Sequence, residues 1–323
     1  MMVLRNNKEE ISMEQMKIVI AGAGIMGASL AQVYGQGGWN TVVYNRSESG
    51  LERCRELVAL NQKSLVLEEM VTAEESAALL ANISYTCDKS CMADCDVLLE
   101  TIVEDMDAKH AFLEEASRIV PETALVATNT SGMSITEIAK AVYLPERFMG
   151  QHWLNPPHLI PLCEITCGEK TDPACAEKMY QQVKALGKRP VLVKKDVTGF
   201  IVNRLQYACL REALSLVENG VADVEDIDTV FKSGVGLRFA AIGFFRMFDF
   251  GGLDTVNAIN KYLNATLDNN PEGSALLDKM VTEGRCGVKT GSGFYEYPGD
   301  TASKMIQKRD ELYITLAKIL FKE

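Results

Sequence analysis

The chain has 323 residues, of which 47% are hydrophobic, and carries a formal net charge of -11. This length and hydrophobic content suffice for one large domain or two moderate domains with buried cores. The acidic balance argues against nucleic acid and anionic membrane surfaces as partners. No stretch reaches the roughly 18 to 20 unbroken apolar residues that a membrane span requires.

The N-terminus and the cysteines predict a cytoplasmic protein. Residues 1–16 are polar and lack the apolar core of a signal peptide, so we expect them to form an extension before the compact fold. Nine cysteines without a secretory signal indicate reduced thiols in a cytosol. Cys87, Cys91 and Cys95 are spaced C-x3-C-x3-C, which differs from the usual zinc and iron–sulfur patterns. We therefore interpret them as ordinary thiols and expect no metal.

Strands and helices alternate over the first part of the chain. Residues 17–21 form a short apolar run that is typical of a buried parallel strand. A glycine-rich turn and a helix as far as Tyr34 follow it. Further strands are expected at 41–44, 83–86, 96–100, 124–129, 148–153, 161–166 and 191–193. This alternation predicts an α/β fold, a Rossmann-like doubly wound sheet over residues 17–197.

The pattern changes at Gly199, after which strand signals are scarce. Residues 201–218 carry apolar side chains at helical spacing, and Asp223 is placed to cap the next helix. Apolar residues between 305 and 320 indicate a final helix. The sequence therefore predicts a smaller, wholly helical domain over residues 198–323.

The glycine-rich turn is a candidate cofactor site. A G-x-G-x-x-G pattern that follows a strand and opens a helix indicates a dinucleotide-binding loop. Gly22 permits the tight turn, Gly24 lets a pyrophosphate approach the backbone, and Gly27 allows the helix to pack closely on the strand. Ile25 and Met26 complete the loop, and the helix N-terminus faces the phosphates.

The end of the second expected strand bears on the choice of cofactor. Asn45 stands where an NAD enzyme normally places Asp or Glu against the ribose 2′-hydroxyl. The amide removes the repulsion toward a 2′-phosphate, for which Arg46 offers a bidentate cation and Ser47 a further donor. These residues favour NADP over NAD. Alternatively, Arg46 is a solvated loop residue and Asn45 binds NAD adequately.

Residues 150–164 contain the candidate reaction centre. His152 ends one apolar run, Asn155 follows in an Asn-Pro pair, and Glu164 lies within a second apolar run. Oxidation of a secondary alcohol requires a base for the hydroxyl proton, and imidazole suits this task because its unperturbed pKa is ~6.5. A carboxylate on the other ring nitrogen would fix the tautomer. The alternatives are a core histidine and a plain strand-end carboxylate; His110 and His158 are interpreted as structural or surface residues.

Several motifs resemble those of the 3-hydroxyacyl-CoA dehydrogenase family. They are AGIMG at 23–27, ETIVED at 100–105, NTS at 129–131, HWLNP at 152–156, GFIVNR at 199–204, GLD at 252–254 and KTGSGFY at 289–295. The resemblance implies a Rossmann-like domain, a helical domain that commonly forms a homodimer, and a catalytic pair of His152 and Glu164.

The same resemblance implies roles for other residues of these motifs. Ser131 and Asn203 match residues that hold the reacting oxygen, and both can donate hydrogen bonds to a developing oxyanion. Asn203 is alternatively a helix-interior amide that bonds locally. Glu104, Lys109 and Asn129 are assigned to the cofactor side of the site, where the first two match positions that line cofactor or substrate phosphates. Asn155 is assigned to the substrate.

One segment departs from the family members that act on CoA esters. Residues 233–245 read SGVGLRFAAIGFF and contain Arg238, which is more similar to the branch of lambda-crystallin, L-gulonate dehydrogenase and carnitine dehydrogenase. Those enzymes oxidise free 3-hydroxy acids, and Arg238 could clamp a free carboxylate unless it faces solvent or the dimer interface. We expect a short-chain 3-hydroxyacyl-CoA as substrate, with a free 3-hydroxy acid as the alternative. A non-catalytic, crystallin-like structural protein is the alternative of another class.

Overall fold

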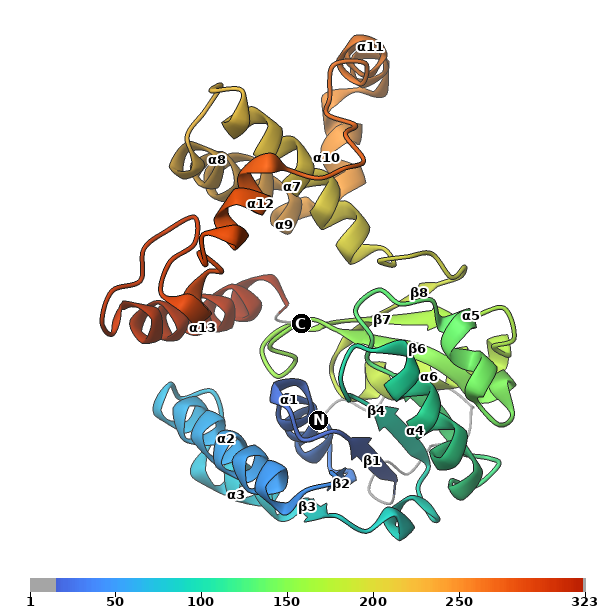
Figure 1. Ribbon diagram of the computed structural model, residues 1–323. Coiled ribbons are helices and arrows are strands. Elements are labelled where there is room, and N and C mark those ends of the chain that lie inside the picture. Colours follow the sequence, from blue (N-terminus) through green and yellow to red (C-terminus); the bar gives the residue numbers. More distant parts are fainter. Residues whose placement is uncertain (1–15, 322–323) are drawn as a thin grey trace. The chain divides into compact units, whose positions relative to one another are not determined.

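The computed structural model describes residues 16–321 of the chain (Figure 1). The chain divides into two compact units, with the boundary between Asn203 and Arg204. The sequence places this boundary slightly earlier, between residues 197 and 198. The extension expected over residues 1–16 lies, except for Met16, outside the described residues.

The first unit contains one eight-stranded sheet with the strand order β3-β2-β1-β4-β5-β6-β7-β8. Every neighbouring pair is parallel except β6 and β7, which are antiparallel. The strands are β1 (Lys17–Ala21), β2 (Asn40–Tyr44), β3 (Ile83–Thr86), β4 (Val97–Glu100), β5 (Leu125–Thr128), β6 (Phe148–Trp153), β7 (Leu162–Cys167) and β8 (Arg189–Val193). Each expected strand is present within two residues, and the predicted Rossmann-like fold is confirmed.

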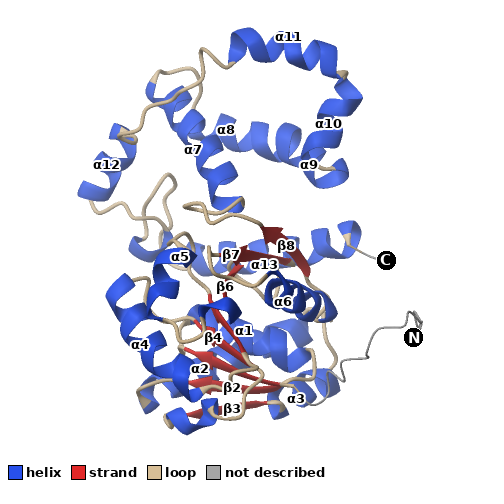
Figure 2. Cartoon of the chain, turned by 90° about the vertical axis from the view of Figure 1, so that its right-hand side faces the viewer, coloured by secondary structure: helices blue, strands red, loops and turns tan. Residues whose placement is uncertain are grey.

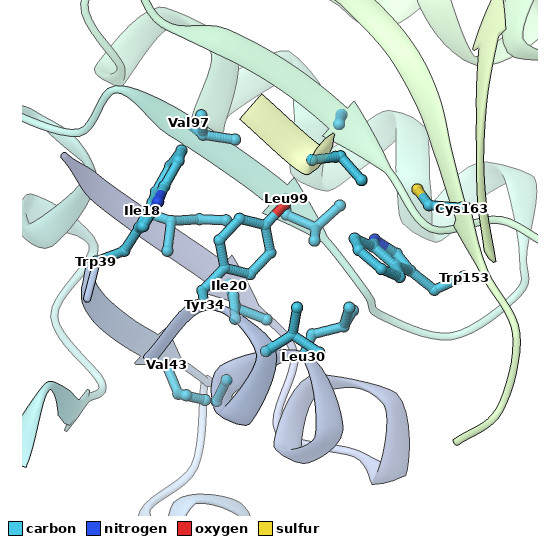
Figure 3. Packing of buried hydrophobic residues seen from close by; sticks show 14 of the residues in the cluster. Ile18, Ile20, Leu30, Tyr34, Trp39, Val43, Val97, Leu99, Trp153 and Cys163 are labelled. Carbon is cyan, nitrogen blue, oxygen red and sulfur yellow. The ribbon is translucent and has the colours of Figure 1, made fainter. Parts of the chain in front are cut away.

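Helices cover both faces of this sheet. They are α1 (Ile25–Gln36), α2 (Glu48–Leu67), α3 (Ala73–Ala81), α4 (Met106–Ile119), α5 (Ile135–Ile138) and α6 (Pro173–Ala185). Because side chains alternate along a strand, β1 contributes to two cores. Ile18 and Ile20 join a cluster with Leu30 and Tyr34 of α1 (Figure 3), whereas Val19 joins a second cluster with residues of α4 and α5.

Short polar residues fix the starts of the helices. Asp172 accepts a hydrogen bond from Ala174 N–H at the N-cap of α6, and Pro173 is the first helical residue. Ser134 accepts from Glu137 N–H at the start of α5, which is one half of a capping box. The Glu137 carboxylate instead pairs with Lys140 at 2.6 Å.

The second unit is helical, as Figure 2 shows, apart from two isolated β-bridges at Ser292. Its helices are α7 (Val202–Glu218, which begins in the first unit), α8 (Val224–Val230), α9 (Gly236–Ile242), α10 (Phe244–Gly251), α11 (Leu253–Leu263), α12 (Ala275–Thr282) and α13 (Thr301–Leu320). A π-helical turn, Phe231–Val235, joins α8 to α9. Asp223 is the N-cap residue of α8, but its side chain makes no capping hydrogen bond there.

Within residues 16–321, no helix combines the length and the apolar character that crossing a bilayer takes.

Candidate active site

The glycine-rich loop joins β1 to α1, and its three glycines meet different constraints. Gly22 has a φ of +127°, and a Cβ there would lie 2.5 Å from Thr101 O. A Cβ on Gly27 would lie 1.9 Å from Gly22 O, whereas no atom lies within 4 Å of the Cβ position at Gly24. Gly22 and Gly27 are therefore needed for packing, and the space at Gly24 fits a diphosphate at the N-terminus of α1.

The residues after β2 form a local hydrogen-bonded turn. Asn45 Nδ2 donates to Ser47 O at 3.1 Å and to Ser47 Oγ at 3.2 Å. Ser47 Oγ also accepts from Gly50 N–H as the N-cap of α2. Arg46 is exposed. Since Asn45 uses its N–H groups within the turn, its Oδ1 is the atom left to accept a bond from a ribose hydroxyl.

His152 and Glu164 meet across the antiparallel pair β6 and β7, in which they are directly opposed. The distance between His152 Nδ1 and Glu164 Oε2 is 2.7 Å. The histidine is 5% exposed and the glutamate 0%. A buried carboxylate is stable only when its oxygens are hydrogen-bonded, and Glu164 Oε1 accepts from the N–H groups of Ile201 and Val202, both at 2.9 Å.

The backbone before α7 presents those two N–H groups. Gly199 and Phe200 both have left-handed conformations, with φ of 77° and 52°. A phenylalanine rarely adopts positive φ, so the surrounding structure must hold it there. The Phe200 side chain is fully buried, and its ring centroid lies 5.5 Å from that of His152. Phe200 therefore shields the histidine from solvent on one side.

Two asparagines, Asn129 and Asn155, were also expected in the site. Asn129, which follows β5, accepts a hydrogen bond from Trp153 N–H at 2.9 Å and so links the ends of β5 and β6. Asn155 precedes Pro156 through a cis peptide bond. The structure thus places Asn129 beside His152 through the backbone of β6.

Ser131 lies in the segment between β5 and α5, which we call the Ser131 turn. Two side chains that were also expected in the site bond to its backbone. Ser131 N–H donates to Glu104 Oε1 at 2.8 Å, and Asn203 Nδ2 donates to Ser131 O at 2.5 Å. Thr130 Oγ1 donates to the same Glu104 oxygen at 2.5 Å. The backbone of Ser131 is therefore held on both sides, while the residue itself is exposed.

Lys109 occupies a different environment from the one expected. It is 1% exposed, and its Nζ lies 2.9 Å and 3.0 Å from the two carboxylate oxygens of Glu100 and 3.3 Å from Glu104 Oε2. The structure thus buries this amine beneath the loop that follows β4. Sequence reasoning missed Glu100; the available signal was an acidic residue that ends a fully apolar strand.

Arg238 belongs to the second unit. It lies on α9, is exposed, and donates from Nε to Gly234 O of the π-helical turn at 3.3 Å.

The Rossmann-like sheet, the glycine-rich loop and the buried histidine–carboxylate pair together define the class of NAD-dependent oxidoreductases. Models of two domains of one family match the chain: "3-hydroxyacyl-CoA dehydrogenase, NAD binding domain" over residues 17–197 and "3-hydroxyacyl-CoA dehydrogenase, C-terminal domain" over 199–297. The chain therefore belongs to the 3-hydroxyacyl-CoA dehydrogenase family, as its motifs predict.

Individual relatives differ in their substrates. The chain is 33% identical over 304 residues to 5-formyl-3-hydroxy-2-methylpyridine 4-carboxylate 5-dehydrogenase of Mesorhizobium japonicum, covering 94% of this chain and 97% of the relative. It is 36% identical to the probable 3-hydroxybutyryl-CoA dehydrogenase of Deinococcus radiodurans, covering 87% of this chain and all of the relative. These matches to dehydrogenases favour an enzyme over the crystallin-like alternative.

Solved structures similar to this chain include both kinds of dehydrogenase. A crystal structure of the pyridine carboxylate 5-dehydrogenase, described as an NAD+-dependent dismutase, has a TM-score of 0.88 at 31% identity and covers 95% of this chain and 99% of its own. That of (S)-3-hydroxybutyryl-CoA dehydrogenase from Ralstonia eutropha has a TM-score of 0.73 at 31% identity, with coverages of 88% and 99%. The comparisons support NAD as cofactor, and the expected preference for NADP finds no support in them.

Proposed function

We propose that His152 is the general acid and base of the hydride transfer and that Glu164 orients it. The observation that carries this proposal is the 2.7 Å bond between His152 Nδ1 and the buried Glu164 carboxylate. Because Nδ1 is engaged, Nε2 is the ring nitrogen available to a substrate. Bound NAD supplies the hydride acceptor or donor, while His152 takes or returns the hydroxyl proton and Ser131 and Asn203 hold the reacting oxygen.

We propose a small carboxylic acid that carries an oxidisable hydroxyl or a reducible carbonyl as the substrate, in place of a CoA thioester. The similarity to the pyridine carboxylate dehydrogenase extends over 304 residues, which is more than the family models cover between Lys17 and Tyr297. Arg238 supplies a guanidinium of the kind that binds carboxylates bidentately.

A short-chain 3-hydroxyacyl-CoA is the second candidate substrate. It is favoured by the descriptions of both family models and by the relatives that are 3-hydroxybutyryl-CoA dehydrogenases.

Initial rates of NADH oxidation across a panel of carbonyl substrates decide between the two. The panel contains free 3-keto acids, aromatic formyl carboxylic acids and acetoacetyl-CoA. We expect turnover of a free acid, and we expect Arg238→Ala to lose that activity, whereas Lys232→Ala, which removes a neighbouring exposed cation, retains it. Faster turnover of acetoacetyl-CoA by the parent enzyme would assign the second candidate.

The cofactor preference is tested in the same assay with NADH and NADPH. We propose NAD, because the Asn45 amide donates to Ser47 and leaves Oδ1 as an acceptor for the ribose hydroxyl. If Arg46 instead binds a 2′-phosphate, NADPH will be the faster cofactor and Arg46→Ala will abolish that advantage.

We also propose that the enzyme acts in the cytosol as a homodimer formed through the helical unit. Within residues 204–321, the only buried large apolar side chains are those of Leu214, Met280 and Ile314. Large side chains such as Phe245, Phe250 and Tyr262 are 65% or more exposed. Such an extensive apolar surface is typical of an interface, and light scattering at micromolar concentration tests the dimer.

A further inference from the structure

A buried charge network connects the end of β4 to the Ser131 turn. Glu100 is 0% exposed and accepts from Lys109 Nζ with both oxygens. The same carboxylate accepts from Thr128 Oγ1 at 2.6 Å and from Ile102 N–H at 2.7 Å. All four contacts are made within the first unit. Each carboxylate oxygen of Glu100 accepts two of them, so the buried charge is fully hydrogen-bonded.

Lys109 carries this network outward to the surface. Its ammonium group lies 3.3 Å from Glu104 Oε2, and the Glu104 side chain is 43% exposed. An isolated exposed carboxylate is free to rotate into water, because a surface ion pair holds it only weakly. The buried ammonium group of Lys109 offers Glu104 a fixed charged partner, which restricts that rotation.

Glu104 in turn holds the backbone of Ser131. Its Oε1 accepts from Ser131 N–H and from Thr130 Oγ1, while Asn203 holds Ser131 O from the other side. The position of the Ser131 hydroxyl therefore depends on Glu104, and the position of Glu104 depends on the buried pair. Displacement of a reacting group by about 1 Å can lower a rate by roughly 10²-fold.

We propose that Glu100 and Lys109 are positioning residues of the reaction, which act through Glu104 on Ser131. This inference rests on the proposed function, in which Ser131 holds the reacting oxygen. It gives both Glu100 and Lys109 a role in supporting the turn.

A double variant separates positioning from stability. Breaking a buried ion pair by a single substitution leaves an uncompensated charge, whereas neutralising both partners is often tolerated. We therefore expect Glu100→Gln/Lys109→Met, in which the glutamine amide still pairs with Ile102 N–H and Thr128 Oγ1, to unfold near the parent Tm. Its kcat should fall by roughly 10- to 100-fold, since Glu104 has lost its anchor.

A second variant keeps the inference testable if the double variant does not fold. Glu104→Ala removes an exposed side chain and leaves the buried pair intact, and it should lower kcat to a similar extent. Combined with the double variant, it should cause little further loss, because residues that act in one chain are not additive. The exposed pair of Glu137 and Lys140 is the control, and Glu137→Gln/Lys140→Gln should retain the parent kcat.

Amide hydrogen exchange at Ser131 gives a readout that does not depend on activity. Exchange should accelerate in the double variant and in Glu104→Ala, because both loosen the bond that Ser131 N–H donates. Parent-like exchange together with parent-like kcat in either variant would overturn the inference. If none of the carbonyl substrates of the panel supports NADH oxidation by the parent enzyme, while exchange responds as expected, the proposed function has failed and the positioning of Ser131 has not.

Discussion

Glu164 bonds to His152 through one carboxylate oxygen and to the start of α7 through the other. The first bond is 2.7 Å long, and the second oxygen accepts from the N–H groups of Ile201 and Val202. One buried carboxylate therefore fixes both the imidazole and the turn that precedes the helix. Loss of its charge should loosen both, which links the stability of this turn to the orientation of the candidate base.

Substitutions at Gly24 and Gly27 should separate cofactor binding from folding. Gly27→Ala should lower the Tm strongly, because its Cβ would lie 1.9 Å from Gly22 O. Gly24→Ala has free space for its Cβ and should unfold like the parent protein. It should nevertheless bind NADH roughly tenfold more weakly or worse, since the added methyl group occupies the approach of the pyrophosphate. Calorimetric titration with NADH and thermal unfolding measure the two effects; parent-like binding by Gly24→Ala would place the diphosphate elsewhere.

Removal of the Phe200 ring should affect both stability and rate. Phe200→Ala deletes a fully buried side chain, which typically costs about 3–5 kcal/mol, and it opens one side of His152 to water. Urea unfolding measures the first effect and kcat the second. Leu67→Ala, at a site that is 71% exposed, is the control and should change the unfolding free energy by less than about 0.5 kcal/mol. Equal effects of the two substitutions would mean that Phe200 does not belong to the core.

Lys188 predicts a pH dependence of stability above neutrality. Burial lowers the pKa of this amine from 10.5 to about 8, and its Nζ donates to Pro157 O at 2.7 Å. Between pH 8 and 10.5 the unfolded chain therefore binds more protons than the folded one, so the contribution of Lys188 to the unfolding free energy rises with pH. The rise is at most about 3 kcal/mol.

The variant Lys188→Met should abolish this rise and should be more stable than the parent at pH 7. Unfolding in urea at a series of pH values measures both effects. Lys184→Met, which changes an exposed lysine on α6, is the control and should leave the pH dependence intact. A parent profile that falls over this range would contradict the lowered pKa.

The strands and the cofactor loop could be predicted because their signals are local. Short apolar runs separated by helical stretches leave few alternatives, and a G-x-G-x-x-G between a strand and a helix has one common use. The pairing of His152 with Glu164 is expected from the family resemblance and from an acid inside an apolar run, and the two side chains do bond. Its directly opposed geometry depends on the antiparallel register of β6 and β7, which the apolar pattern alone does not specify.

Other features depend on depth and on tertiary contacts that spacing does not reveal. Lys109 lies in a motif with Glu104, so a contact with phosphates was a reasonable expectation, but the fold buries its amine against Glu100. In the second unit, α7 was predicted almost to the residue. The shorter helices α9 to α11 were not delimited in the sequence, because they follow one another with only Gly243 and then Gly252 between them.

The single-turnover rate of NADH oxidation by His152→Ala, with the best substrate of the panel at saturation, tests the central claim most directly. We predict a rate lower than that of the parent by roughly 10²- to 10⁴-fold, with unchanged affinity for NADH, whereas His110→Ala should react at the parent rate. A His152→Ala enzyme that oxidises NADH as fast as the parent would contradict the assignment of the acid and base.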